Sequence, residues 1–273
     1  MTSGSTKKGG TTAKKTTQTR KRASKPADKA RGKPKEGVRE PSLLARVVLF
    51  VIGIVVLPLS LSLIRTLIKI ERLLGITGDL GLSSQAGMFI LGFLLFCILF
   101  VVLRMPMKPY LFAHELTHAL FGLLHGAKIS RLRVDDVKGS VKVSRGGAIV
   151  LLAPYFFPFY MAIVMLAFGI LCIGFGLVGT FLGDVFAGLA GLAWGFHFCF
   201  TVNSLLQPQS DLEVYGFFFS LSLILFLNLA VLCLVHIALT QVTFGEMSGL
   251  AIYLAKDSFS WLWNAFCETA WPP

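Results

Sequence analysis

The chain has 273 residues, of which 55% are apolar and 15% charged, with a formal net charge of +12 and a mean hydropathy of +0.73. This composition excludes an ordinary soluble domain and a disordered protein, and it indicates a polytopic membrane protein. Half of the Lys and Arg residues precede residue 42, where few acids accompany them, so the positive charge belongs mostly to the N-terminus.

Residues 1–41 are rich in Lys, Thr, Ser, Gly and Pro and contain almost no large apolar side chains. Such a segment cannot bury enough surface to fold, so we predict a disordered basic tail. The positive-inside rule places this tail in the cytoplasm. We expect it mainly to set the topology; binding to anionic lipid stays open as an alternative, and nucleic-acid binding is disfavoured.

Residues 42–109 are expected to contain two N-terminal transmembrane segments, at about 43–64 and 86–103. Between them, residues 65–84 place apolar residues on one side of a helix and basic residues on the other. That pattern is typical of an interfacial helix that lies on the membrane surface.

The next apolar segment, about 110–125, contains the peptide His114-Glu115-Leu116-Thr117-His118. Two histidines four residues apart share one helix face and can hold one zinc ion, with the glutamate between them placed to act as a general base on water. The alternative is a chance match with histidines packed in a core. A carboxylate and two imidazoles are costly at membrane depth, which favours the zinc site.

Beyond this helix the apolar and polar residues alternate, and residues 127–144 are predicted to form a β-hairpin. Apolar spans follow at about 149–178, 185–206 and 214–242, and a Trp-rich stretch at 244–271 is typical of an interfacial helix. The fold expected is therefore an all-α polytopic membrane protein with about six membrane segments and one small β-hairpin. The GxxxG spacings Gly179/Gly183 and Gly191/Gly195 predict close helix packing and are compatible with a homo-oligomer.

A catalytic zinc ion needs three protein ligands and one open position, so a third ligand must come from elsewhere in the chain. Asp211 and Glu213 directly follow a span, and Pro208 breaks the helix before them, as occurs where a span borders a polar site. Three other intramembrane candidates have weaker arguments: Asp184, His197 and His236.

The motif helix, the hairpin and the later span together resemble the site-2 protease family of intramembrane zinc metalloproteases. The resemblance rests on HExxH in a short membrane helix, a hairpin after it, and a later span that ends with Asn203, Pro208 and Asp211. The family typically shows Asn-x-x-Pro-x-Pro-x-x-Asp-Gly there. In this chain Leu206 replaces the first proline and Leu212 replaces the glycine, so Glu213 is kept as a fallback ligand.

The resemblance implies that zinc is held by His114, His118 and Asp211, that Glu115 is the general base, and that Asn203 binds the substrate backbone. It implies hydrolysis of a peptide bond in or near a transmembrane segment of a membrane-protein substrate. We expect a multi-pass protein of a bacterial cytoplasmic membrane, embedded in the lipid bilayer. The domains expected are the tail 1–41, the two N-terminal segments 42–109, the metalloprotease core 110–216, and the last transmembrane segment with the C-terminal helix 217–273.

Three other functions compete with this interpretation. One is a different class of membrane HExxH protease, whose third ligand would be Glu246; Leu250 stands where that class has an aspartate. A second is a catalytically inactive scaffold or chaperone-like relative, against which the intact Glu115 argues. A third is a metal transporter, which would need polar residues spread over several spans.

Overall fold

The computed structural model describes residues 1, 4, 41–75, 82–103, 105–134, 139–144 and 146–270. Its contacts divide the chain into residues 1–32 and 33–273, and every described helix and strand lies in the second unit. Nearly all of the predicted basic tail, the predicted hairpin turn at 135–138 and Trp271 lie outside the described residues.

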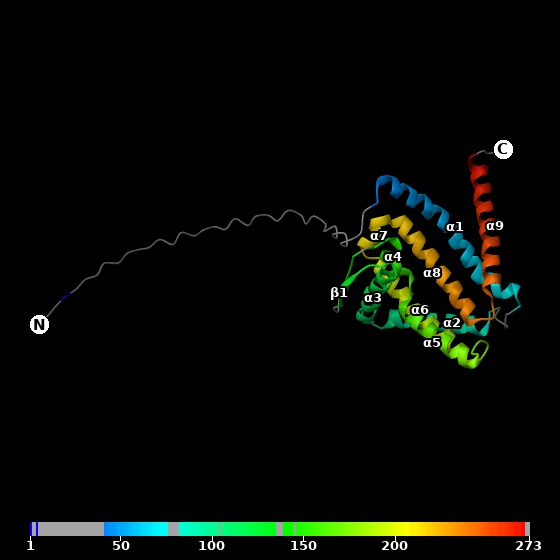
Figure 1. Cartoon of the computed structure of the whole chain (residues 1–273), viewed down its shortest axis with the longest axis horizontal. Helices are drawn as coiled ribbons and strands as arrows, with labels where there is room; N and C mark the ends of the chain where they lie inside the picture. Colours follow the sequence, from blue (N-terminus) through cyan, green and yellow to red (C-terminus); the bar gives the residue numbers. More distant parts are fainter. Residues whose placement is uncertain are drawn as a thin grey trace. The chain divides into compact units, whose positions relative to one another are not determined.

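The described residues form helices joined by short connections, together with two strands (Figure 1). The elements are α1 (Leu43–Leu73), α2 (Ser84–Val102), α3 (Lys108–Leu124), β1 (Ile129–Val134), β2 (Gly139–Val143), α4 (Ala148–Phe156), α5 (Phe159–Phe175), α6 (Phe181–Leu205), α7 (Ser210–Tyr215), α8 (Phe217–Leu239) and α9 (Phe244–Ala270).

Among the described residues, four helices are long and apolar enough to cross a membrane: α1, α2, α6 and α8. Helices α4 and α5 together give a fifth candidate, bent by 76° at their junction. Helix α3 has 17 residues and falls short of a full crossing. The chain is thus predominantly helical and has the apolar helices of a membrane protein, while the number of crossings remains a prediction.

The strands β1 and β2 occupy the region where the sequence alternates, and they pair antiparallel with Ile129 opposite Val143 and Val134 opposite Gly139. Both strands contact α3, the helix that carries the HExxH residues. At this contact the side chains of Val143 and Ile129 lie so close to Gly122 that a Cβ there would be 2.8 Å from Val143 Cγ1. The two-stranded sheet is therefore fixed against one face of α3.

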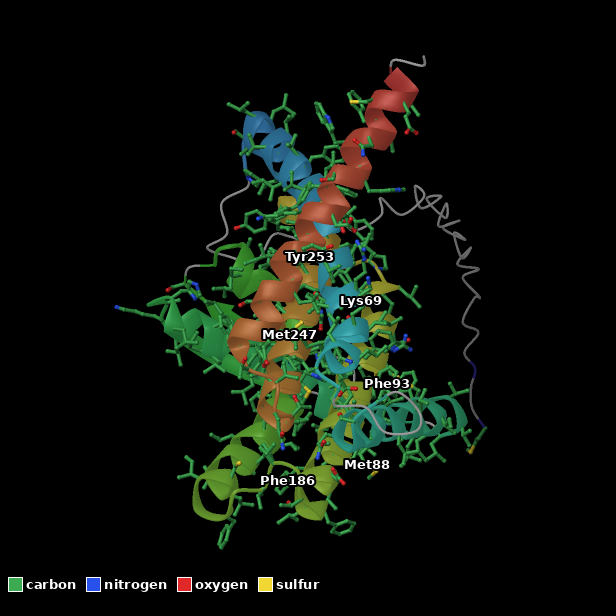
Figure 2. The ribbon with its side chains drawn as sticks, turned by 90° about the vertical axis from the view of Figure 1, so that its right-hand side faces the viewer. Lys69, Met88, Phe93, Phe186, Met247 and Tyr253 are labelled. Carbon is green, nitrogen blue, oxygen red and sulfur yellow. The ribbon has the colours of Figure 1, made fainter. Side chains whose placement is uncertain are left out.

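Two elements differ from what the sequence led us to expect. The separate interfacial helix at 65–84 is absent from the described part of that range, because α1 continues without a break to Leu73. Part of its apolar side is buried inside the protein: Ile70 is 2% exposed and lies in a cluster with Cys233, Val242 and Met247, whereas Ile68 and Leu73 on the same segment are exposed. In Figure 2, α1 with Lys69 and α9 with Met247 and Tyr253 lie side by side.

The second difference is the expected span at 149–178, which is broken into α4 and α5. Pro158 begins the new helix and has no N–H to continue the hydrogen-bond ladder of α4. The break leaves backbone carbonyl groups that need other partners, and Asn228 of α8 donates to the Tyr155 carbonyl oxygen at 3.0 Å. The bend is thus held by a side chain that lies far away in the sequence.

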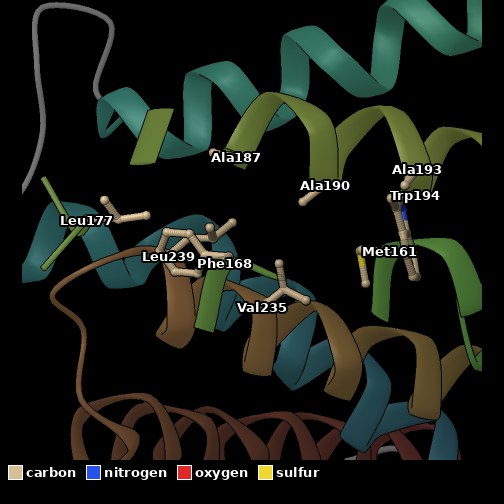
Figure 3. Packing of buried hydrophobic residues seen from close by; sticks show 9 residues of the cluster. All are labelled: Met161, Phe168, Leu177, Ala187, Ala190, Ala193, Trp194, Val235 and Leu239. Atoms are coloured by element: carbon tan, nitrogen blue, oxygen red, sulfur yellow. The ribbon is translucent and has the colours of Figure 1, made fainter. Parts of the chain in front are cut away.

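The main apolar core lies between α5, α6 and α8 (Figure 3). Small residues line the inner side of α6, where Ala187 and Ala190 are fully buried and Trp194 fills the space beyond them. On its other side α6 packs against α2 at very short range. A Cβ built on Gly191 would lie 1.9 Å from the Phe89 carbonyl oxygen, so the GxxxG spacing there serves packing within the chain.

Gly191→Leu is expected to destabilise the protein by about 2–3 kcal/mol, because the added side chain meets the α2 backbone rather than a side chain that can move. The measurement is the thermal or denaturant midpoint of the purified protein in detergent. The matched control is Gly169→Leu in α5, where a Cβ meets nothing within 4 Å. Equal midpoints for the two variants would contradict the close approach of α2 and α6.

Candidate metal centre

Three side chains from two distant parts of the chain meet beside α3. His114, His118 and Asp211 each offer a ligand atom, and these atoms all lie within 4.8 Å of one another. The Nε2 atom of His118 is 3.5 Å from Oδ2 of Asp211. Both residues are buried, with 2% and 4% of their surfaces exposed. A His-His-Asp group of this size could hold a metal ion.

His118 is oriented by a hydrogen bond to the backbone of α4. Its Nδ1 lies 2.9 Å from the carbonyl oxygen of Val150, which can only accept, so Nδ1 carries the proton and donates. The lone pair is therefore on Nε2, the atom that faces Asp211. Metal-binding histidines commonly use a second-shell carbonyl in this way to fix the tautomer and the ring orientation.

His114 is held among aromatic rings. Its ring centroid lies 5.2 Å from that of Tyr155 at an interplanar angle of 88°, and 5.7 Å from that of Tyr110. The His118 ring lies 4.9 Å away, one helical turn along the same face of α3. Tyr155 is fully buried, so this contact limits the rotation of the His114 ring.

Asp211 is brought to the histidines by the break between α6 and α7. Helix α6 ends at Leu205, and Pro208 prevents its continuation. Gln209 stabilises the break with two hydrogen bonds. Its amide nitrogen donates to the Ser204 carbonyl at 2.9 Å, and its amide oxygen accepts from the Tyr155 hydroxyl at 3.2 Å. These bonds fix the start of α7, in whose first turn Asp211 lies.

The other end of α7 is held by Tyr215. Its hydroxyl donates to the Gly146 carbonyl at 3.5 Å, in the segment that follows β2. Burial raises the pKa of Tyr215, which keeps the hydroxyl protonated as a donor. Leu212, beside Asp211, is 1% exposed and packs in a cluster with Tyr155 and Ile224. Asp211 is thus supported from both ends of a six-residue helix.

Glu115 lies on α3 between the two histidines and is 5% exposed. Its carboxyl group lies against the first residue of β2, since a Cβ on Gly139 would be 2.6 Å from Glu115 Cγ and 2.9 Å from Oε1. Only glycine leaves the carboxylate in this place without displacement. Strand β2 therefore limits the positions that the Glu115 side chain can take.

Gly139→Val is expected to lower turnover in any reaction that uses Glu115 by about 10²-fold, the usual effect of a 1 Å displacement of a reacting group. Metal content should not change, because the substitution touches none of the three ligands. Ser140→Val is the matched control, since its side chain points to the opposite face of the strand and is exposed. Equal turnover in the two variants would contradict a positioning role for Gly139.

The fallback ligand Glu213 is exposed and does not join the group, although it lies only two residues from Asp211. On the short helix α7 the two side chains point about 160° apart, so only one can face α3. Asn203 is half-buried near the end of α6, and its backbone carbonyl accepts from the Gln207 amide at 3.5 Å. Its expected role in binding substrate stays a prediction.

The remaining candidate ligands have other partners or other positions. Asp184 accepts from the Ser84 hydroxyl at 2.6 Å, which joins the first turns of α6 and α2. His236 lies 3.8 Å from Glu71 in another part of the fold. Glu246 accepts from the backbone and hydroxyl of Thr243, a capping box at the start of α9.

Four groups that position the candidate ligands or Glu115 were not predicted from the sequence: the Tyr155 ring, the Gln209 amide, the Val150 carbonyl and the backbone of Gly139. The Pro208 break was a signal that a neighbouring amide such as Gln209 would be needed for the unpaired backbone groups. Nothing in the sequence singled out Tyr155 or Val150, because their roles depend on how α4 lies against α3.

The donor set fits a divalent ion that accepts nitrogen and oxygen ligands. Two imidazoles and one carboxylate are typical of catalytic zinc, and three protein ligands leave a fourth position open. The buried Asp211 carboxylate gains a countercharge when such an ion binds, which is the usual condition for burying a charge.

Comparisons with protein-family models, with curated proteins and with solved structures find no match for this chain.

Proposed function

We propose that the protein is an intramembrane zinc metalloprotease of the site-2 protease type, which hydrolyses a peptide bond in or near a transmembrane segment of another membrane protein. The observation that supports this most strongly is the placement of Asp211 beside His118, at 3.5 Å, with the glutamate of the same HExxH motif buried between the histidines on α3. The apolar spans around the group favour a substrate that is itself in the membrane.

In this proposal His114, His118 and Asp211 hold the metal. When bound, zinc polarises water and the scissile carbonyl group. Glu115 accepts the proton of the attacking water and then gives it to the leaving amine nitrogen. Glu115 and Asp211 are buried, so bulk water screens their charges little, which strengthens their electrostatic interactions.

The strand β2 offers a way to hold the substrate. A peptide bond in a helix is shielded by its own hydrogen bonds, so the substrate must unwind locally before hydrolysis. Among the described residues β2 pairs only with β1, and its first residue, Gly139, touches Glu115. An unwound segment added alongside β2 would therefore lie near the general base. Asn203 could provide a further hydrogen bond to the substrate backbone.

The test is zinc content and proteolysis measured on the same preparation of full-length protein in lipid nanodiscs. We expect about one zinc per chain and cleavage of a transmembrane peptide whose sequence contains a helix-breaking residue. Zinc binding without cleavage of any peptide in a panel would favour the inactive scaffold. Cleavage that persists after complete removal of metal by a chelator would contradict the proposed mechanism.

A further inference from the structure

Asn228 is a polar residue near the middle of α8, an otherwise apolar helix of membrane length. Helix α8 supplies no ligand to the candidate metal centre. An amide at this depth is costly unless it is hydrogen-bonded, and asparagines in membrane helices commonly bond across to a neighbouring helix. The groups that the Asn228 amide contacts therefore indicate what this residue contributes.

The Asn228 amide joins α8 to the end of α4. Its nitrogen donates to the Ile224 carbonyl oxygen of its own helix at 2.8 Å and to the Tyr155 carbonyl oxygen at 3.0 Å. The Tyr155 carbonyl lies in the last turn of α4, where a helix leaves carbonyl groups without partners, and Pro158 has no N–H to offer. Asn228 thus fixes the backbone of Tyr155 at the bend between α4 and α5.

His197 of α6 reaches the same point from the other side. Its ring interacts with the Tyr155 backbone and with the Asn228 side chain, and the residue is buried. It does not belong to the group of candidate metal ligands, although the sequence made it a candidate. This buried histidine therefore supports the backbone of α4 instead of binding the metal. Helices α6 and α8 together hold Tyr155 through two polar side chains.

The side chain of Tyr155 contacts both halves of the candidate metal centre. Its ring lies edge-on to His114 at a centroid distance of 5.2 Å. Its hydroxyl donates to the Gln209 amide oxygen at 3.2 Å, two residues before Asp211. In Figure 1, α4 lies among α3, α7 and α8, and it contacts all three. The position of Tyr155 therefore affects the ligands from α3 and the ligand from α7 together.

A small displacement of Tyr155 is enough to disturb a metal site. Tyr155 is fully buried, and a close-packed interior transmits such a displacement to the neighbouring side chains. Metal–ligand distances tolerate changes of only about 0.2 Å. Loss of the bond that fixes the Tyr155 carbonyl would therefore change the arrangement of the His114 and Asp211 donor atoms, while all three ligands stay present.

From these contacts we infer that Asn228 and His197 are positioning residues for the metal centre, which act through Tyr155 on His114 and Asp211. This role rests on the metal site of the proposed function. The functional unit then extends beyond the predicted metalloprotease core of residues 110–216 and includes α8, a span that carries no ligand.

The experiment compares Asn228→Leu with Ser222→Ala in full-length protein in nanodiscs. Leucine has nearly the size of asparagine but no amide, whereas Ser222→Ala removes a hydroxyl that bonds only within α8, to the Phe218 carbonyl at 2.9 Å. The measurements are zinc affinity by competition with a chelator and the visible absorption of cobalt(II) bound in place of zinc, which depends on ligand arrangement. We expect Asn228→Leu to weaken zinc binding about tenfold, the lower end of the effect of residues that support metal ligands, and to change the cobalt absorption. Ser222→Ala should keep the wild-type values.

Wild-type zinc affinity and cobalt absorption in Asn228→Leu would overturn the inference, and so would equal changes in Ser222→Ala. A second pair of variants, His197→Gln and His197→Leu, keeps the test decisive if Asn228→Leu does not fold. Glutamine can still hydrogen-bond to the Tyr155 backbone and leucine cannot. The Gln variant is therefore expected to keep most of the zinc affinity that the Leu variant loses, and equal affinities in this pair would also overturn the inference.

Failure of this inference and failure of the proposed function give different results. A wild-type protein that binds no zinc and cleaves nothing contradicts the proposed function before any variant is compared. A wild-type protein that binds zinc and cleaves, with the same zinc affinity and cobalt absorption in Asn228→Leu, keeps the protease and removes the positioning role of α8.

Discussion

Glu115→Gln is expected to lower the cleavage rate of a transmembrane substrate by about 10²–10⁴-fold, the usual contribution of a general base. Glutamine has nearly the same shape as glutamate, so the contact with Gly139 is kept while the ability to accept the water proton is lost. Zinc content should stay at the wild-type level, because Glu115 is not among the grouped ligands. The measurement is the rate of product formation in nanodiscs, followed by mass spectrometry.

The control is Glu213→Gln, which makes the same chemical change at an exposed position two residues from Asp211. It should cleave at the wild-type rate. Full activity in Glu115→Gln would remove the protease proposal, since no other acid in the described structure lies between the two histidines on α3.

Asp211→Ala has the second largest expected effect, a loss of zinc affinity of more than about 100-fold. Removal of a residue that only supports a ligand costs 10–100-fold, and loss of a direct ligand should exceed that. The cleavage rate should fall in proportion to the loss of bound zinc. Zinc is measured by metal analysis after dialysis against a chelator of graded strength.

Glu213→Ala is the matched control, because it removes a carboxylate from the same short helix without touching the group. Stoichiometric zinc in Asp211→Ala together with loss of zinc in Glu213→Ala would show that α7 turns the other way and that the fallback ligand is the real one. Retention of zinc in both would place the third ligand outside α7.

Local sequence patterns were sufficient for part of the site. The spacing of His114 and His118 specifies one helix face whatever the surroundings, because a helix places residues four apart above one another. Pro208 predicted the end of a helix before Asp211 for an equally local reason, because proline has no N–H to donate. The overall helical membrane character follows from long apolar runs, which need no tertiary contact to be recognised.

Other features depended on contacts that the sequence does not specify. The bend between α4 and α5 needs Asn228 from another helix to satisfy the Tyr155 carbonyl. The continuation of α1 to Leu73 follows from the burial of Ile70 against α8 and α9, where a surface helix had been expected. The apolar run at 149–178 fitted either one straight span or two shorter helices, and the amphipathic pattern after residue 64 fitted either a membrane surface or a protein interior. Only packing distinguished these environments.

The sequence by itself determined that this is a mostly helical protein with apolar, membrane-length helices and that two histidines and a glutamate share a face of one of them. The tertiary structure decided which acid joins them, because Asp211 and Glu213 point in different directions from α7 and only Asp211 lies with the histidines. It also decided where Glu115 lies, since Gly139 of β2 rests on its side chain. Distances across a packed interface depend on how whole helices and strands lie against one another, and no local pattern of residues encodes that arrangement.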